Sequence, residues 1–427
     1  VIQWPINVKT GELSNTPDWK AQDKLDEVSY DEREILTYDG SSAYAFVSAN
    51  STDNGGPIPL SGDLINYLRG DPSNNQANGG SYRVRNGKLG DIVHSAPYYQ
   101  QGVIYIGAND GMMHAFDADT GEELFAYVPQ ILLDAGTLPD LSDPGYSHKF
   151  YVDNTVYVRK ISSSQTLLVG GLRKGGKGYY CLDVNNPGSI SESNAGALVK
   201  WEYSADANSD DDMGYSYSRA YIVKTSASYN GNNWMVIFGN GYDSVNEKAM
   251  LYVLDAQTGT VLRKLDTEVN GCNGLASPAI ADVDSDGVVD YAYAGDLKGN
   301  MWKFDLTSDN YNEWSCAYAD GSTPMPLIQV KNESGGQPIT VEPDVMRMAC
   351  APGHKGYLVF FGTGQYMGTN DFGNTDTQTF YGVWDWQDNW PESENPAGTY
   401  LGEFVATDSP PLLSIPPNEA DGLTLLE

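Results

Sequence analysis

The sequence has few cationic residues for its length. Its 427 residues include 25 Lys and Arg against 57 Asp and Glu, which gives a formal net charge of −32. Nucleic acids and anionic membrane surfaces are both recognised by cationic surfaces, so this composition argues against both kinds of partner. An excess of carboxylates instead favours solubility and the binding of cations.

The sequence also lacks long apolar runs and the usual metal or nucleophile motifs. No apolar run approaches the ~20 residues of a transmembrane helix. The cysteines show no CxxC spacing, so a zinc site is not expected, and the four histidines show no HExxH spacing. An even number of cysteines is compatible with disulfides outside the cell, but their pairing stays open. The cysteines are Cys181, Cys272, Cys316 and Cys350.

Glycine and tyrosine are abundant. There are 46 Gly, 22 Pro and 29 Tyr, while charged residues make up only 19% of the chain. Many turn-forming residues together with many tyrosines favour an all-β protein. With 40% hydrophobic and 11% aromatic residues, intrinsic disorder is not expected.

One strand–turn–strand pattern recurs along the chain. In residues 103–127 an apolar strand ends at Gly107, an Asn-Asp-Gly turn follows, and a second strand ends in Asp117. The intervals between equivalent positions vary from 56 to 69 residues, as expected when loops are inserted into a repeated scaffold. The glycines that end the first strand of each repeat are Gly107, Gly170, Gly239, Gly295 and Gly362.

Each repeat is predicted to have a further strand upstream. Three or four antiparallel strands form one blade of a β-propeller, and a blade buries both of its faces only when blades stack around an axis. We therefore predict an irregular, all-β propeller of about seven blades, with long inter-strand insertions and one short helix. A β-sandwich with long hairpins is the alternative, which the repeated pattern favours less. The upstream strands are expected at residues 92–97, 216–223, 275–280 and 339–345.

The propeller is predicted to occupy residues 1–427 as a single domain. We expect an irregular lead-in over 1–30, blades over 30–385 and a tail over 386–427. Two further segments could hold strands: 38–47 in an earlier blade, and 400–406 closing the ring. The chain begins at Val1, with no Met and no signal peptide, so we expect a fragment or mature portion of a longer protein.

Residues 282–290 carry the clearest chemical signal. Side-chain oxygens fall at positions 1, 3, 5 and 9 of this loop, position 7 offers a backbone carbonyl, and Gly287 at position 6 permits a tight turn. This is the first part of the EF-hand ligand set. The twelfth position is Tyr293 rather than Glu, and the flanks have strand patterns. We therefore predict a calcium loop within a β-hairpin, with ligands Asp282, Asp284, Asp286, Val288 and Asp290.

Calcium suits this loop because the clustered carboxylates repel one another without a cation. Hard oxygen ligands on a flexible loop favour calcium over softer metals and over octahedral magnesium. The alternatives are a solvated turn, or a bound ion that only staples the hairpin. Residues 206–212 are a weaker candidate for a second cation site, because they lack the glycine at position 6.

Arg69-Gly70-Asp71 is an integrin-type tripeptide. It follows a predicted helix over residues 62–68, which Ser61 can cap and for which Gly70 supplies the residue after the C-terminus. Gly70 therefore already has a structural role, and such tripeptides arise often by chance. Adhesion, through this motif or through a loop at the top of a blade, is therefore kept as an alternative functional hypothesis.

An enzyme of the quinoprotein type is a third hypothesis, because glycine-rich propeller repeats occur in those dehydrogenases. Their chemistry typically requires an axial calcium-bound quinone and a disulfide between adjacent cysteines. No two cysteines are adjacent here, and the acidic loop is a self-contained hairpin site. We therefore expect a protein that is not an enzyme.

Taken together, four segments resemble the C-terminal β-propeller domain of the PilY/PilC family of type IV pilus-associated proteins. They are GDIVHSAP at 90–97, YIGANDGMMHAFDADTGEE at 105–123, IFGNGYDS at 237–244 and the stretch 281–306. The resemblance extends over residues 30–385.

The resemblance implies a secreted protein that is not an enzyme and lies at the pilus tip and outer-membrane surface. Its expected partners are pilins or minor pilins, with a host-cell receptor as a further expectation. The family's calcium loop matches the residues from Asp282 to Asp290 by type, and calcium there is linked to the balance of pilus extension and retraction. Some members carry an integrin-binding Arg-Gly-Asp. Cys181 stands where a small residue is usual.

Overall fold

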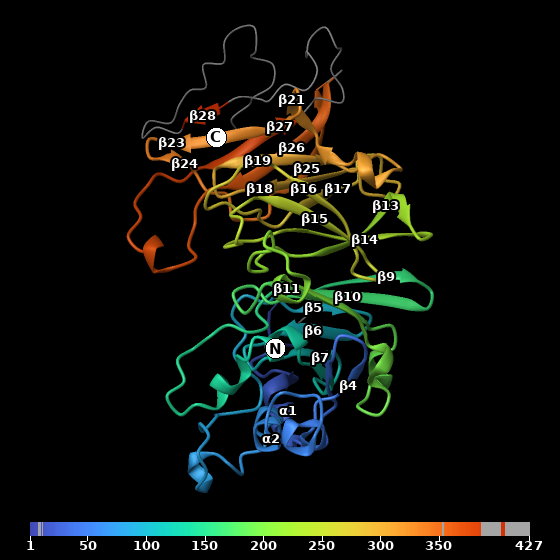
Figure 1. Cartoon of the computed structure of the whole chain (residues 1–427), viewed down its shortest axis with the longest axis vertical. Helices are drawn as coiled ribbons and strands as arrows, with labels where there is room; N and C mark the ends of the chain where they lie inside the picture. Colours follow the sequence, from blue (N-terminus) through green and yellow to red (C-terminus); the bar gives the residue numbers. More distant parts are fainter. Residues whose placement is uncertain (7–9, 11, 352–353, 386–402, 406–427) are drawn as a thin grey trace. The chain divides into compact units, whose positions relative to one another are not determined.

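The chain forms two compact units that consist mainly of β-strands (Figure 1). The computed structural model describes residues 1–6, 10, 12–351, 354–385 and 403–405. The first unit is Val1–Ser209 and the second is Asp210–Glu427, and each is described by itself. Within the described residues, none of the helices combines the length and the hydropathy needed to span a bilayer.

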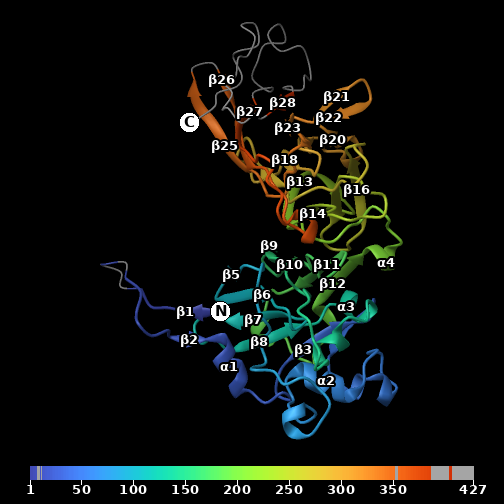
Figure 2. The same cartoon turned by 90° about the vertical axis from the view of Figure 1, so that its left-hand side faces the viewer.

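The first unit contains a six-stranded sheet in the order β4-β3-β8-β7-β6-β5 (Figure 2). All neighbours are antiparallel except β3 and β8, which are parallel. The strands are β3 (Ile35–Tyr38), β4 (Ala43–Ala45), β5 (Tyr98–Gln100), β6 (Val103–Gly107), β7 (Met113–Asp117) and β8 (Glu123–Tyr127). The strands expected within 38–47 therefore do not form an earlier blade: β3 adds to the edge of the first repeat.

A second sheet of the first unit has the order β12-β11-β10-β9 and is antiparallel throughout. Its strands are β9 (Tyr157–Ser162), β10 (Gln165–Gly171), β11 (Gly178–Asp183) and β12 (Val199–Ser204). A short pair, β1 (Ile2–Gln3) and β2 (Trp19–Lys20), lies in the lead-in. The unit also contains α1 (Ala21–Glu27), α2 (Gly62–Arg69), α3 (Gln130–Asp134) and α4 (Ala205–Asn208).

The second unit begins with the four-stranded sheet β13-β14-β15-β16, which is followed by the sheet around β18 and β19. The first has strands β13 (Tyr221–Tyr229), β14 (Asn232–Gly239), β15 (Met250–Asp255) and β16 (Val261–Asp266). The next contains β17 (Ala279–Ala281), β18 (Tyr291–Gly295), β19 (Asn300–Asp305), β20 (Ser315–Cys316), β23 (Ile328–Asn332), β24 (Gly335–Gly336) and β28 (Glu403–Val405).

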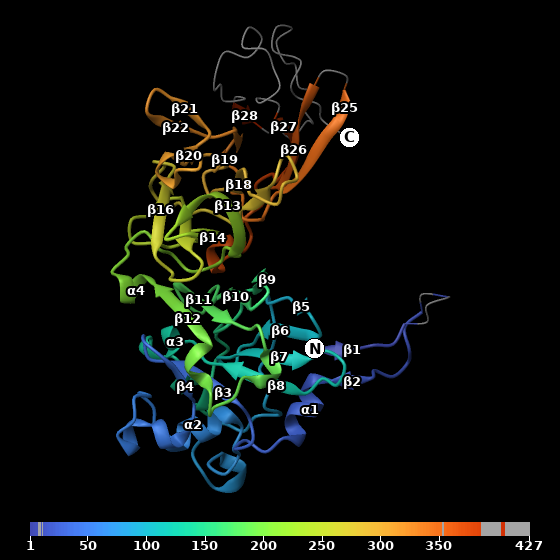
Figure 3. The ribbon, with the colours of Figure 1, turned by 90° about the vertical axis from the view of Figure 1, so that its right-hand side faces the viewer.

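The last sheet, β25-β26-β27, has two long strands side by side (Figure 3). Its strands are β25 (Asp344–Ala351), β26 (His354–Gly362) and β27 (Phe380–Asp385), and a separate hairpin comprises β21 (Tyr318–Asp320) and β22 (Thr323–Met325). From the tail, β28 pairs in parallel with β23 of the same unit. Residues 386–402 and 406–427 lie outside the described residues.

Five blade-like sheets thus appear among the described residues, and each contains one of the repeated glycines near the end of its second main strand. A Cβ on Gly107 would lie 2.3 Å from the carbonyl oxygen of Val152, and one on Gly239 would lie 2.2 Å from that of Ala276. The glycine therefore permits the next chain segment to pack against the strand end. At Gly362, none of the described residues lies within 4 Å of such a Cβ. The single domain and the count of about seven blades stay predictions.

The upstream strands begin later than predicted. The ladders start at Tyr98, Tyr221, Ala279 and Asp344. Before β5, side chains replace strand partners: the Ser95 hydroxyl accepts the Gly107 N–H at 2.9 Å, and Asp153 accepts the His94 N–H at 3.0 Å. Ser218 accepts the Gly239 N–H in the same way, at 2.9 Å.

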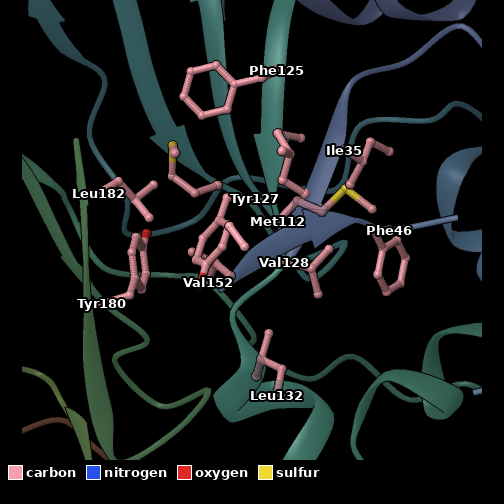
Figure 4. Close-up of a cluster of buried hydrophobic side chains, with 14 of the residues drawn as sticks. Ile35, Phe46, Met112, Phe125, Tyr127, Val128, Leu132, Val152, Tyr180 and Leu182 are labelled. Atoms are coloured by element: carbon pink, nitrogen blue, oxygen red, sulfur yellow. The ribbon is translucent and has the colours of Figure 1, made fainter. Parts of the chain in front are cut away.

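The core of the first unit lies between its two sheets and α3. Figure 4 shows Tyr127 from β8 beside Tyr180 and Leu182 from β11, with Phe125 of β8 above them and Leu132 of α3 below them. These side chains are at most 1% exposed, and burying each apolar side chain contributes roughly 1.5–3 kcal/mol. Two further clusters fill the second unit, one around Trp302 and one around Val359.

Helix α2 matches the prediction closely. The Ser61 hydroxyl accepts the Leu64 N–H at 3.3 Å, and Gly70 has a φ of 121° at the C-terminal end. A side chain is strained at this φ, so the glycine fits the position.

Candidate metal centre

The acidic loop connects β17 to β18 at the end of an antiparallel hairpin. Ala281 pairs with Tyr291, and the loop spans Asp282 to Asp290 between them. No helix flanks the loop, in agreement with the predicted departure from the EF-hand. Side chains of β18 alternate between two core clusters: Ala292 and Ala294 belong to one, and Tyr293 belongs to the other.

Three carboxylates of this loop converge. One oxygen each from Asp282, Asp284 and Asp290 lies within 4.8 Å of the other two. Oxygens that bind the same calcium ion at about 2.3–2.6 Å lie at most about 5 Å apart, so this spacing suits one cation. Asp282 and Asp284 are exposed, whereas Asp290 is partly buried. The two exposed groups leave an ion accessible from solvent.

The structure does not bring all five predicted ligands together. Asp286 lies outside the three-carboxylate group, and its Oδ1 accepts the N–H of Val288 at 2.7 Å. The Val288 residue itself lies in the same turn, just before β18. Asp286 and Val288 therefore stay predicted ligands.

Backbone N–H groups fix the orientation of Asp282. Its Oδ1 accepts the N–H of Ser285 at 2.7 Å, and its Oδ2 accepts the N–H of Gly287 at 2.8 Å. Ser285 and Gly287 have φ values of 68° and 85°, which curl the loop back around this carboxylate. Asp290 is held similarly, since its Oδ2 accepts the Val283 N–H at 2.7 Å. Each carboxylate oxygen has further lone pairs for a cation.

Burial and repulsion raise the pKa of Asp290. Burial is the larger cause, and the negative charges of Asp284, Asp282 and Asp286 add to it, while the Val283 N–H acts in the opposite direction. A cation bound beside Asp290 would offset both effects. The charge distribution of the loop thus favours an ion.

The loop is connected to the sheets on either side of it. The N–H of Val289 donates to the carbonyl of Lys224 in β13 at 2.8 Å, and Val289 is only 3% exposed. On the other side, the Tyr357 hydroxyl in β26 donates to the carbonyl of Val283 at 3.2 Å. The conformation of the loop is therefore coupled to β13 and β26.

The candidate at 206–212 is neutralised by a lysine. The Lys264 ammonium pairs with Asp210 and lies 3.0 Å from Asp212, and the Tyr252 hydroxyl donates to Asp210 at 2.9 Å. This ammonium takes the place that a metal ion would need. Asp206 lies on α4 and is exposed. The arrangement does not favour a second cation site.

The arginine of the Arg-Gly-Asp tripeptide is buried, so the tripeptide lacks the exposed geometry of an adhesive motif. Arg69 is 2% exposed and pairs with Glu192, while its other donors bind the carbonyls of Tyr30, Phe46 and Arg33. An integrin-type contact requires an exposed guanidinium, so an adhesive role has no support from this geometry. Sequence reasoning could not foresee the buried Arg69, because Glu192 is distant in the chain.

A buried ionic cluster in the first unit was missed in the sequence. His114, on β7, contacts Glu123 through Nδ1 at 2.7 Å and Asp110 through Nε2 at 3.2 Å. Arg33 in turn contacts Glu123 at 2.8 Å, and the side chains of all four residues are at most 5% exposed. We call Arg33, Asp110, His114 and Glu123 the ionic quartet. No local sequence pattern predicts this cluster, because β7 reads Met-His-Ala-Phe-Asp and its polar residues do not alternate.

The described cysteines differ in their exposure. Cys181 is buried in β11, Cys272 is exposed, and Cys316 is partly buried with a pKa raised to about 12, mainly by burial. The side chain of Cys350 lies outside the described residues.

These features define a β-propeller-type domain with an acidic hairpin loop. Residues 89–399 match the family described as the PilY1 beta-propeller domain. The chain belongs to this family.

Curated relatives and a solved structure agree with this assignment. The chain is 37% identical over 380 residues to the type IV pilus biogenesis factor PilY1 of Pseudomonas aeruginosa strain PAK, over 76% of this chain and 31% of the relative. It is 37% identical over 385 residues to a PilY1 homolog of Xylella fastidiosa, over 78% and 25%. The chain thus spans about a quarter to a third of these relatives' lengths.

The crystal structure of the Pseudomonas aeruginosa PilY1 C-terminal domain matches with a TM-score of 0.55 and 35% sequence identity. The match covers 71% of this chain and 60% of that one. The relatives are named as biogenesis factors rather than as enzymes.

Proposed function

We propose that this chain is the part of a type IV pilus biogenesis factor through which calcium controls the pilus. The convergence of Asp282, Asp284 and Asp290 on a span that suits one ion is the observation that supports it most strongly. Membership of the family supports a role in the pilus, and the acidic loop supports control by calcium. The protein would act outside the cell, at the pilus tip and the outer-membrane surface, without enzymatic activity.

Calcium would act by neutralising the loop. Without an ion, Asp290 is a partly buried carboxylate beside other carboxylates, and its raised pKa reflects that cost. With an ion, the loop would hold one conformation, which its contacts with Lys224 and Tyr357 would transmit to β13 and β26. The surface of the second unit formed by the loop, β13 and β26 would then dock on pilins or minor pilins. This docking would oppose retraction of the pilus.

Replacing Asp284 and Asp286 with alanine in the full-length protein is expected to reduce the number of surface pili. Two carboxylates would be lost, the ion would bind weakly, and retraction would then dominate. Pili sheared from cells are quantified in strains with and without the retraction motor. Pilus numbers should fall only where the motor is present.

The matched control is Asp309→Ala with Asp320→Ala, because both residues are exposed and lie outside the loop while the change in net charge is the same. Wild-type pilus numbers in the loop variant would overturn calcium control. A loss in both strains would show instead that the loop is needed for assembly.

A further inference from the structure

The first unit contains a small pocket beside the end of α2. It has a volume of about 190 Å³ and is lined by three chain segments: the end of α1, the end of α2 with the residues after it, and residues 85–88. Pockets for drug-sized ligands are larger, about 300–1,000 Å³. The space suits a single small functional group.

Arg85 is the unusual member of the wall. Its guanidinium stacks on the ring of Tyr67, 4.4 Å from the centroid, and donates one hydrogen bond to the carbonyl of Tyr67. Within the described part of the chain, no carboxylate oxygen lies within 4.0 Å of this guanidinium. A guanidinium has five donors in a planar fork, so most of them are left for a ligand. Burial lowers the pKa of Arg85. Tyr67 and the Asp110 carboxylate act in the opposite direction, and the charges of Arg33 and Arg83 add to the lowering.

The second cation of the wall, Lys88, is held by backbone carbonyl groups. The Lys88 ammonium donates to the carbonyls of Leu25, Asp26 and Val28 at 3.2, 3.0 and 2.6 Å, at the end of α1. Its stem passes Gly70, where a Cβ would lie 2.7 Å from Lys88 Cδ. Lys88 therefore adds positive charge to the wall, while Gly70 keeps room for its stem.

The two carboxylates of the wall are engaged elsewhere. Asp26 accepts the Lys88 N–H at 2.9 Å and the amide of Gln22 at 2.7 Å. Asp71 accepts the N–H of Ser73 at 2.9 Å and also its hydroxyl. Their negative charges weaken the positive field, so a singly charged ligand is favoured over a dianion such as phosphate.

We propose that this pocket binds one carboxylate group, with Arg85 as its bidentate anchor. Planar forks of Arg match the two oxygens of a carboxylate, and the stacking on Tyr67 fixes the fork in advance. The carboxylate would come from an acidic side chain of a partner protein or from a small organic acid. The site lies in the first unit and does not depend on the calcium loop.

The test is an acetate titration of the whole chain labelled with ¹⁵N-arginine, followed by NMR at constant ionic strength. The side-chain Nε–H signal of Arg85, assigned with Arg85→Gln, is expected to shift and saturate. Arg83 is the internal control, because it stacks on Tyr146 at 4.1 Å and does not line the pocket. Its signal should not follow that of Arg85.

A variant and a second ligand extend the titration. Asp71→Asn removes a like charge while keeping an acceptor for Ser73, so it should tighten acetate binding by about two- to tenfold. A blocked tripeptide with a central Glu distinguishes the sources: tighter binding than acetate indicates a side chain, and weaker binding indicates a free acid. A shift that does not saturate, an equal shift of Arg83, or a stronger response to phosphate would overturn the proposal.

Discussion

Replacing Glu123 with glutamine is expected to lower the free energy of unfolding of the first unit by about 3–5 kcal/mol. Glu123 is the shared carboxylate of the ionic quartet, contacting Arg33 with both oxygens and His114 with one. Without its charge, two buried cations would share only the carboxylate of Asp110. Breaking a buried ion pair by removing one partner leaves the other uncompensated, which is the source of this large effect.

Urea unfolding of the whole chain measures this change, with the transition of the first unit followed by its own spectroscopic signal. Glu122→Gln is the matched control, because Glu122 is adjacent and exposed. The control should change stability by less than about 0.5 kcal/mol. A loss below 1 kcal/mol for Glu123→Gln would show that the quartet contributes little to stability.

Raising the pH is expected to destabilise the same unit through His114. The pKa of His114 is raised from 6.5 to about 9: burial lowers it, but the carboxylates of Asp110 and Glu123 more than offset that effect. A histidine with a raised pKa stabilises the folded state fully below pH 6.5, and this contribution is lost as the pH rises through about 9. The loss amounts to about 3 kcal/mol, at about 1.4 kcal/mol for each pH unit.

Thermal unfolding between pH 6 and pH 10 measures this dependence. His114→Gln should remove much of the alkaline decline, since glutamine has no proton to lose. At the acidic end, Glu123 has a pKa lowered to about 2 by Arg33 and His114, against the effect of burial. Its contribution is therefore lost as the pH falls from about 4.5 to about 2. A flat profile between pH 6.5 and pH 9 would contradict a charged His114.

Sequence patterns predicted the local features of this chain well. The repeated glycines mark strand ends because a Cβ at Gly107 or Gly239 would collide with the next segment. A single residue type therefore reveals each strand end in the sequence. Ser61 and Gly70 are local helix signals, and they bound α2 as expected. The acidic loop was also recognisable from local sequence, because its predicted ligands follow one another within nine residues.

Features that depend on distant contacts were not predictable in this way. Nothing in Arg69-Gly70-Asp71 reveals that Glu192 and three backbone carbonyls bury the arginine. The pairing of β3 with β8 joins segments that are distant in the chain, so a strand pattern at residue 38 looked like a separate blade. The sequence of residues 206–212 likewise does not reveal that Lys264 pairs with Asp210.

Calorimetric titration of calcium into the chelator-stripped chain tests the central claim most directly. The account predicts one saturable site per chain, lost in the Asp284→Ala/Asp286→Ala variant and retained in the Asp309→Ala/Asp320→Ala control. Circular dichroism of all three proteins should show the same β-rich fold. No calcium binding by the wild-type chain, or equal binding by the loop variant, would contradict the claim that the acidic loop is a calcium site.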